Sequence, residues 1–267
     1  MLRAATVITL FLLSSCASVQ LNKDALASVK SVAIVGFTGT TDLVDRSQAK
    51  PKSGFGDVIN SVKNAQDVFS GELDKRGLAQ GETTYAALKR KLEASMGWKV
   101  ADRATVAADP TYAKLLKENP NTDSMMVMGL HRVPDVLRAS VARNLDAQER
   151  SNMCQRLGVD ALVFSDFNYV IGDKTGFAMG GIGSITIHPK AVISLAVLDG
   201  TEKPLWQDAW AEGQPTKEGF SNTMGVENRV EVESGVLNTA TESALTHLMV
   251  RFNEAQKAKE SAGGGTR

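Results

Sequence analysis

The sequence has 267 residues, of which 43% are hydrophobic and 22% charged, with 30 basic and 30 acidic side chains. This length and hydrophobic content suit one domain with a sizeable core. The balanced charge gives no support for a nucleic-acid or other polyanionic partner, or for electrostatic adhesion to acidic lipid.

The first fifteen residues have the three parts of an export signal. Arg3 makes the start positive, and residues 4–13 form an apolar run. That run is too short to span a bilayer as a helix, which takes about 20 apolar residues. Leu13-Ser14-Ser15-Cys16 ends it and resembles the lipobox, at which bacterial lipoproteins are cleaved before a lipidated cysteine. The alternative is an ordinary secretory signal in which the cysteine is accidental.

The residue after the cysteine is Ala17. By resemblance to the lipoprotein sorting rule of Gram-negative bacteria, Ala17 implies the outer membrane, with the protein facing the periplasm, because aspartate there would favour the inner membrane. The anchor would be acyl chains buried in the bilayer, and several chains on one cysteine make it durable. Removal of the signal peptide removes one charged residue, Arg3, so 29 basic and 30 acidic side chains remain.

The expected organisation, in chain order, is a signal peptide at 1–15, a lipidated tether at 16–29, a single α/β domain at 30–259 and a disordered tail at 260–267. Fully extended, the tether reaches about 40 Å at about 3.3–3.6 Å per residue. Lipidation of Cys16 leaves Cys154 without an intramolecular partner, so we predict no disulfide.

Periodic patterns predict strands and helices in the first half of the domain. These are a strand at 31–37, a long loop with a helix over about 57–76 closed by Gly77, a helix over 82–96 ended by Gly97, a short strand and exit at 98–103, and a partly helical stretch at 104–117 interrupted at Asp109-Pro110. The state of residues 124–144 is ambiguous.

In the second half, Asp146 and Glu149 form a capping pair that predicts the start of a helix ending at Leu157-Gly158. The remaining elements are strands at 159–171, 184–198 and 204–212, and a helix over 233–259. This order predicts an α/β (α+β) fold, in which helices pack on one mixed sheet.

Residue types that could support metal or nucleophilic chemistry are scattered. The three histidines, His131, His188 and His247, belong to no zinc-binding motif, and the sequence has no nucleophile elbow and no P-loop. We therefore expect no metal and no cofactor. Cys154 could in principle pair with a histidine, but its helix places it beside Met153 and Leu157, which predicts a buried, inert thiol.

Residues 176–183 are the one glycine-rich stretch. Such a stretch could cradle a phosphate if a helix followed it, or insert into a membrane or a partner as a flexible loop. The residues that follow, Ser184 to Ile187, alternate like a strand instead. A mobile hairpin loop is therefore the favoured interpretation.

Trp206 and Trp210 lie four residues apart on a predicted strand and should share one face, with Asp208 between them. This trio is the candidate partner-binding site, because paired indoles beside a carboxylate could stack on a sugar or anchor a protein. The alternative is that both indoles cover the sheet beneath the C-terminal helix. In a carbohydrate-active or other hydrolytic enzyme, Asp166 or Asp173 would supply the second carboxylate.

Four segments together resemble landmarks of one group of envelope lipoproteins, which includes the curli-secretion-channel lipoproteins and the lipoprotein activators of penicillin-binding proteins. The segments are Ser31-Val-Ala-Ile-Val-Gly-Phe37, Trp98-Lys-Val-Ala-Asp-Arg103, Leu157-Gly-Val-Asp-Ala-Leu-Val163 and the stretch from Ala191 to Trp206. The resemblance spans most of residues 30–255 but not 38–81 or 119–145, and it assigns no functional residue here.

The function of neither lipoprotein family can be transferred directly to this chain. An activator of inner-membrane enzymes must reach across the cell wall, and about 40 Å is too short for that. A channel needs lipid-facing strands of about 9–11 residues, for which Phe177 to Ile187 is a poor candidate. A non-catalytic accessory or scaffold lipoprotein with an envelope protein partner is the hypothesis that remains, and a hydrolytic enzyme is the alternative.

Overall fold

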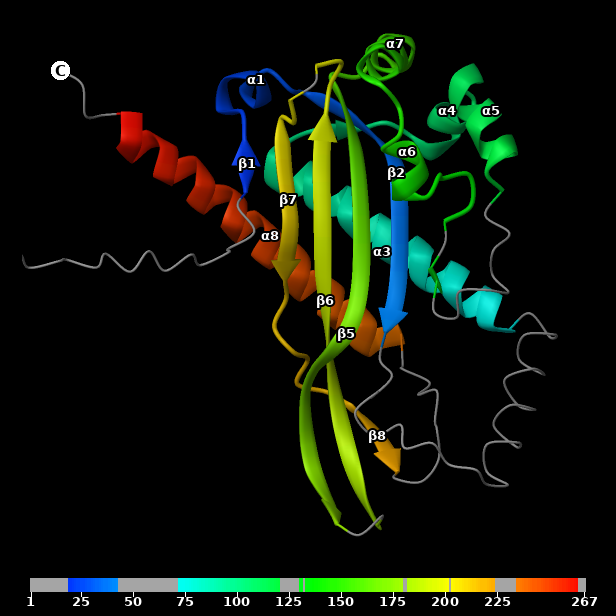
Figure 1. The fold of residues 1–267 in the computed structure, drawn as a ribbon, viewed down its shortest axis with the longest axis vertical. Helices are drawn as coiled ribbons and strands as arrows, with labels where there is room; N and C mark the ends of the chain where they lie inside the picture. The colour runs from blue at the N-terminus through cyan, green and yellow to red at the C-terminus, as the bar shows by residue number, and fades with distance from the viewer. Residues whose placement is uncertain are drawn as a thin grey trace, which may run out of the picture.

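The computed structural model describes residues 19–42, 72–120, 130–131, 133–179, 182–201, 203–223 and 234–263. The predicted signal peptide, Cys16 and Ala17 lie outside these residues. Within them the chain forms a single α+β domain with helices packed on a mixed sheet (Figure 1). This confirms the predicted fold class.

The sheet is built around a long antiparallel hairpin. Its strands follow the order β1 (Gln20–Leu21), β7 (Trp206–Glu212), β6 (Ile182–Leu198), β5 (Ala161–Met179), β2 (Ser31–Asp42) and β3 (Lys99–Val100). β2 runs parallel to β3 and β5, and the other neighbours in this order are antiparallel. Two short strands add to it, β4 (Leu130–His131) on β2 and β8 (Phe220–Thr223) on β6.

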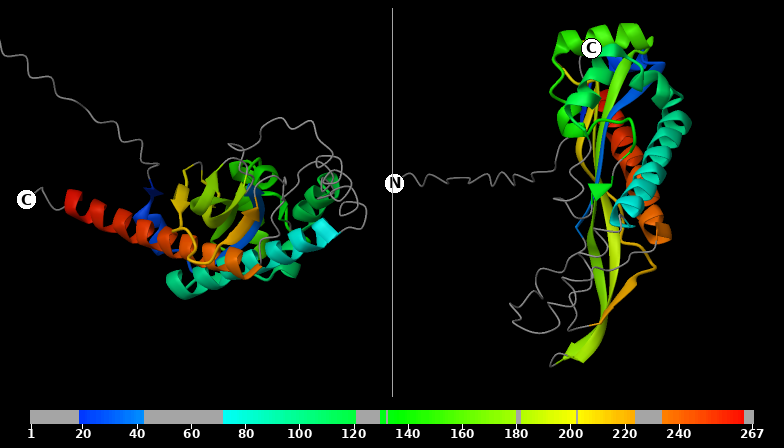
Figure 2. Two further views of the ribbon diagram at one scale, coloured as in Figure 1. Left: turned by 90° about the horizontal axis from the view of Figure 1, so that it is seen from below. Right: turned by 90° about the vertical axis from the view of Figure 1, so that its right-hand side faces the viewer.

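Helices cover the sheet on both faces (Figure 2). One face carries the two long helices α3 (Glu72–Met96) and α8 (Ser234–Gly263). The other face carries α4 (Arg103–Ala107), α5 (Pro110–Glu118), α6 (Ala139–Ala142) and α7 (Ala147–Leu157). A short helix, α1 (Lys23–Ala27), follows β1 at the sheet edge.

The apolar run of β2 follows from this layering. Val32 and Ile34 belong to the core cluster beneath α3 and α8, whereas Ala33 and Val35 belong to the cluster on the opposite face. Successive side chains of a strand point to opposite faces, so a strand covered on both sides is apolar at every position.

The structure confirms the predicted helix starts and ends that depend on residues within one helical turn. Asp146 and Glu149 form a reciprocal capping box at the start of α7. Gly158 ends α7 at φ +64°, and Gly97 follows α3 at φ +66°, a left-handed conformation that glycine adopts most readily. α4 and α5 are separate helices divided at Asp109, as the Asp-Pro pair predicts.

The predicted helix end at Gly77 is wrong. α3 begins at Glu72 and continues through Gly77 and Gly81 to Met96. Each glycine costs a helix about 1 kcal/mol, and burial of residues such as Leu88 and Leu92 in the core offsets that cost. Residues 43–71, with most of the helix predicted over 57–76, lie outside the described part of the chain, as do residues 124–129.

The predicted tether over 16–29 is also wrong for its described part. Residues 20–27 form β1 and α1, and Leu21, Leu26 and Val29 are buried in the core cluster beneath α3 and α8. Val19 packs against the same cluster. The described part of the fold therefore reaches Val19, which lies three residues from Cys16 in the sequence.

The glycine-rich stretch lies at the end of a long hairpin, as predicted, but its described residues are strand rather than loop. β5 and β6 pair from Leu162↔Leu198 to Met179↔Ile182, so the part of residues 176–183 that the structure describes is strand. The register shifts between Ile171 and Asp173, beyond which the hairpin projects past the helices (Figures 1 and 2). No sequence pattern predicted β8, and α8 continues to Gly263, into the predicted tail at 260–267.

Candidate functional site

β7 begins with a tryptophan that belongs to the core. The Trp206 side chain is fully buried, and its ring centroid lies 4.7 Å from that of Phe252 in α8 and 6.5 Å from that of Trp98. Leu21 of β1 is its register partner at the sheet edge. Trp206 therefore lies beneath α8, as in the alternative interpretation of the sequence.

Asp208 points to the same face and is 0% exposed. Its Oδ2 accepts a hydrogen bond from Arg251 Nε at 2.7 Å, and its Oδ1 accepts one from Arg251 Nη2 at 3.0 Å. Oδ1 also accepts the main-chain N–H of Trp210 at 3.0 Å. A carboxylate held this way by a guanidinium ties β7 to α8 and is not presented to a sugar or a protein at the surface.

A β-bulge turns Trp210 away from these two residues. In the register with β6, Asp208 pairs with Leu195 and Ala211 with Ile193, so both Ala209 and Trp210 lie opposite the single residue Ser194. The extra residue reverses the alternation of side chains along β7. Trp210 is 53% exposed, whereas Ala211 is buried beneath α8. The prediction that Trp206 and Trp210 share a face is therefore wrong.

Trp210 belongs to a small polar cluster, the Trp210 cluster, made of Lys190, Trp210 and Glu212. The Trp210 indole donates from Nε1 to Glu212 Oε2 at 3.1 Å, and the Lys190 ammonium forms an ion pair with Glu212 Oε1. The hydrogen bond from Lys190 lowers the pKa of Glu212 below its ordinary value, partly against the effect of burial. The ion pair neutralises the charges beside the indole, so the cluster presents an aromatic surface with little net charge.

The outer edge of β7 is partly covered beside this cluster. β1 pairs only with Trp206 and Gln207. Farther along the strand, Asp208 accepts the Trp210 main-chain N–H, and the His247 ring nitrogen Nδ1 contacts the Glu212 carbonyl oxygen. A bulge and side chains bonded to edge groups are features that discourage pairing with another strand. The cluster is therefore better suited to side-chain contacts than to strand addition.

The carboxylates considered for an enzyme do not come together with Asp208. Asp166 forms an ion pair with Arg143, Nη1 to Oδ2 at 2.6 Å, and accepts a hydrogen bond from Ser194 Oγ. Arg143 follows α6, so Asp166 lies on the sheet face opposite Asp208, whose partner is in α8. Asp173 is exposed on the projecting hairpin. Asp166 and Asp208 cannot flank one glycosidic bond across the sheet.

The histidines serve separate parts of the fold. His131 is buried, and burial lowers its pKa to about 4. His188 contacts Thr175 Oγ1 at 2.9 Å and the Thr216 carbonyl oxygen at 3.0 Å, and His247 meets β7. Within the described residues no group of three or more His, Cys, Asp or Glu side chains could hold a metal ion.

Cys154 lies in the core cluster under α7, as the sequence predicts. Its residue is 8% exposed, and burial is the largest cause that raises the pKa of the thiol, to about 11. Nearby Asp199 and Asp160 raise it further. A thiol in this setting is a poor nucleophile at neutral pH.

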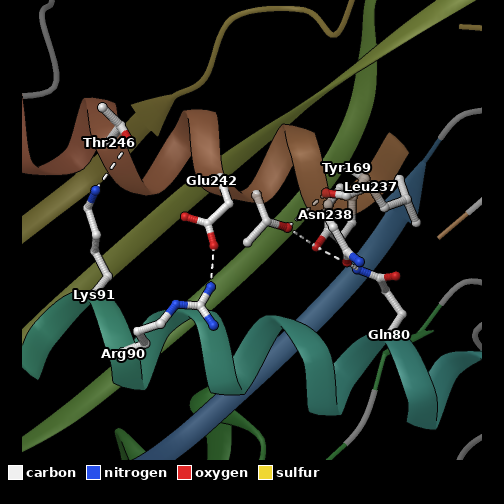
Figure 3. A network of polar contacts seen from close by, with 9 residues as sticks. Gln80, Arg90, Lys91, Tyr169, Leu237, Asn238, Glu242 and Thr246 are labelled. Atoms are coloured by element: carbon white, nitrogen blue, oxygen red, sulfur yellow. Dashed lines mark hydrogen bonds and ion pairs between the residues drawn. The ribbon is translucent and has the colours of Figure 1, made fainter. Parts of the chain in front are cut away.

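A second group of polar side chains joins the two long helices to the sheet (Figure 3). The buried Tyr169 hydroxyl of β5 lies 2.8 Å from Thr84 Oγ1 of α3 and 2.6 Å from Thr241 Oγ1 of α8. Gln80 of α3 bridges Tyr169 and Asn238. Because these groups bond to one another in the interior, they fix how α3 and α8 sit on the sheet.

Comparison with protein-family models gave no match, and comparison with curated protein sequences gave none. Among solved structures, the chain is similar to the crystal structure of lipoprotein GNA1162 from Neisseria meningitidis, with 14% identity and a TM-score of 0.25. The match covers 79% of this chain and 94% of that one. A similarity at this level defines neither fold nor function. Among the described residues, no helix is long and apolar enough to cross a membrane.

Proposed function

We propose that this chain is a lipid-anchored protein of the bacterial cell envelope, whose domain acts as a non-catalytic accessory or scaffold in envelope assembly or transport. The observation that carries the proposal is the export signal ending in Leu13-Ser14-Ser15-Cys16, followed after two residues by Val19, which packs against the core. A chain cut at this cysteine has a lipid attachment site next to an intact domain.

The outer membrane, facing the periplasm, is the proposed location because Ala17 follows the cysteine. The reach of the anchor supports a partner near that membrane. From Cys16 to Val19 the extended chain spans about 10 Å, which is shorter than the tether expected from sequence. A domain held so closely suits a partner in or beside the same membrane and does not suit one across the cell wall. The motif resemblance to curli-channel and penicillin-binding-protein-activator lipoproteins favours this envelope setting.

The side chains singled out for chemistry support a non-catalytic role. Asp208 is engaged by Arg251, Asp166 by Arg143, and Cys154 is buried with a raised pKa. The proposal predicts that Asp166→Asn and Asp173→Asn leave the cellular role intact, since neither carboxylate acts as an acid, base or nucleophile. Loss of that role in either variant, with folding retained, would favour the hydrolytic enzyme.

The anchor is tested by Cys16→Ala. This variant should remain uncleaved or soluble, lose incorporation of labelled palmitate, and no longer sediment with membranes. Cys154→Ala is the matched control, because it removes the other cysteine and should retain the label and the membrane fraction. Normal processing and membrane association of Cys16→Ala would refute the lipid anchor. Ala17→Asp should shift the protein toward the inner membrane.

The scaffold role is tested by lysine-reactive crosslinking in cells that express the wild type or Cys16→Ala. We expect an envelope protein to crosslink to the wild type and to be lost when the anchor is removed. Absence of any reproducible partner in the anchored protein would contradict a scaffold.

A further inference from the structure

We infer that the edge of the sheet carrying Trp210 lies against the membrane that holds the lipid anchor, with the indole at the level of the lipid headgroups. This inference rests on the proposed lipidation of Cys16. It assigns a role to the one member of the predicted tryptophan site that the fold leaves exposed.

The chain between the proposed lipid and the described part of the fold is short. Only Ala17 and Ser18 separate Cys16 from Val19, which packs against the core. Three residues span at most about 10 Å. Because the acyl chains are buried in the bilayer, the part of the domain next to Val19 must lie close to the membrane surface.

The strand register identifies the part of the domain that lies next to Val19. β1 is antiparallel to β7, with Leu21 opposite Trp206 and Gln20 opposite Gln207. From Leu21 back to Val19, the chain therefore runs along β7 in the direction of Trp210. Val19 immediately precedes Gln20, which pairs with Gln207. The two strands run in opposite directions at the sheet edge in Figure 1. The anchor consequently leaves the domain beside the Trp210 cluster.

The surface beside the anchor site carries an exposed tryptophan. Trp210 is 53% exposed, while Trp98 and Trp206 are 4% and 0% exposed. Trp210 is thus a large hydrophobic side chain exposed on β7, and β7 contacts β1. Tryptophan is enriched at membrane interfaces, where its ring is partly buried and its N–H remains hydrogen-bonded.

The charges of the Trp210 cluster are compatible with this position. Glu212 is neutralised by Lys190 and accepts the Trp210 Nε1–H, so the carboxylate of the Trp210 cluster does not face the lipid phosphates as an isolated anion. The indole reaches the interface with its polar atom already bonded. Anchor and indole would then hold the domain at two neighbouring points and fix its orientation on the membrane.

The test is fluorescence quenching of the full lipidated protein in liposomes of phosphatidylethanolamine and phosphatidylglycerol that contain a lipid brominated close to the headgroup. The contribution of Trp210 is the emission lost in Trp210→Phe, because the buried Trp98 and Trp206 supply the rest. We expect brominated lipid to quench most of the Trp210 contribution and to leave the emission of Trp210→Phe unchanged.

A matched control lengthens the tether without altering the domain. About 20 Gly and Ser residues inserted after Ser18 let the chain ends separate by about 25 Å on average. Quenching should then fall well below that of the wild type. Strong and equal quenching of Trp210 in the two proteins would support the membrane-facing edge and assign the contact to the indole itself, whereas quenching of Trp210 in neither protein would overturn the inference.

Other outcomes separate this inference from the lipid anchor itself. The mass of the N-terminal peptide is measured first, because an unmodified Cys16 refutes the proposed function. A lipidated protein whose Trp210 is not quenched refutes only the membrane-facing edge. A photo-crosslinker at position 210 that captures an envelope protein instead of lipid would likewise overturn the inference and make this edge a protein-binding surface.

Discussion

Trp206 and Trp210 lie four residues apart in one strand and have opposite surroundings. Trp206 contacts Phe252 and Trp98 in the core, whereas Trp210 is half exposed and hydrogen-bonded to Glu212. The bulge at Ala209 and Trp210 causes this difference, so the two indoles contribute to stability and to surface chemistry separately.

Replacing each tryptophan with alanine tests this separation. Trp206→Ala should lower the free energy of unfolding by about 3–5 kcal/mol, because it removes a buried large aromatic side chain. Trp210→Ala should change it by no more than about 0.5 kcal/mol, as is usual for an exposed position. Urea unfolding of the soluble domain measures both. A large loss in Trp210→Ala would mean that the exposed indole belongs to the core after all.

Cys154 is expected to react slowly with thiol reagents in the folded protein at neutral pH. Burial raises the pKa of its thiol to about 11, so thiolate is scarce until the pH rises well above the pKa of an ordinary cysteine. Burial also limits the access of reagents to the sulfur. Labelling followed by mass spectrometry should show slow modification in buffer and rapid modification in denaturant. Rapid labelling of the native protein would revive a cysteine nucleophile.

At the scale of the elements, β7 and α8 form one unit. The Asp208–Arg251 pair, the contact of His247 with Glu212 and the packing of Trp206 on Phe252 join strand to helix along most of β7. The ion pair and the aromatic contact require that Asp208 and Trp206 point to the same face, and Ala211 is buried on that face as well. The bulge between Asp208 and Ala211 lets these two residues face the same side although they lie three positions apart.

Deletion of Ala209 should therefore be tolerated. Without it the strand alternates regularly, with Asp208 and Ala211 still toward α8 and Trp210 still outward. The expected cost is about 0.5–1.5 kcal/mol, mainly the lost hydrogen bond from the Trp210 main chain to Asp208. Circular dichroism during heating measures the effect.

Deletion of Gln207 is the contrasting variant. It shifts the alternation so that Trp206 and Asp208 can no longer both face α8. Turning Trp206 away would empty its site in the core, and turning Asp208 away would break its buried ion pair with Arg251. Either change costs about 3–5 kcal/mol. Similar melting temperatures for the two deletions would show that the bulge does not determine which side chains of β7 point toward α8.

Sequence patterns predicted those features that depend on neighbours within a turn or a strand. The capping box at Asp146 and the left-handed Gly158 are of this kind. The continuation of α3 through Gly77 depends instead on its packing with the sheet and α8, and no local pattern reports that packing. Docking of Leu21 and Leu26 similarly depends on β7 and the core, which lie far away in the sequence.

The candidate site was located by sequence, but its geometry was not. The spacing of Trp206, Asp208 and Trp210 selects the correct strand, whereas a bulge leaves no signature in the residue types at Ala209 and Trp210. The partners are also distant: Lys190 lies 22 residues from Glu212, and Arg251 lies 43 residues from Asp208. Only the pairing of β6 with β7 and the packing of α8 bring them together.

At the scale of the whole molecule, the domain has a core on each side of the sheet, and the N-terminal segment belongs to one of them. Leu21, Leu26 and Val29 are each no more than 5% exposed and pack in the cluster beneath α3 and α8. Asn22 caps α1, and its main-chain N–H donates to the Leu205 carbonyl oxygen at 2.9 Å. Residues 19–29, which follow the proposed anchor site at Cys16, are thus a part of the fold.

Truncation distinguishes these two possibilities in the soluble protein. A chain that begins at Lys30 should be much less stable than one that begins at Ala17, because it lacks three buried aliphatic side chains, each contributing about 1.5–3 kcal/mol on burial. Even with the lower value, the loss is a large share of a typical folding free energy of about 5–15 kcal/mol. Leu26→Ala in the longer chain should show an intermediate loss. Equal urea midpoints for the two chains would mean that residues 17–29 are a tether, and the domain would then be free to sit tens of ångströms from the membrane.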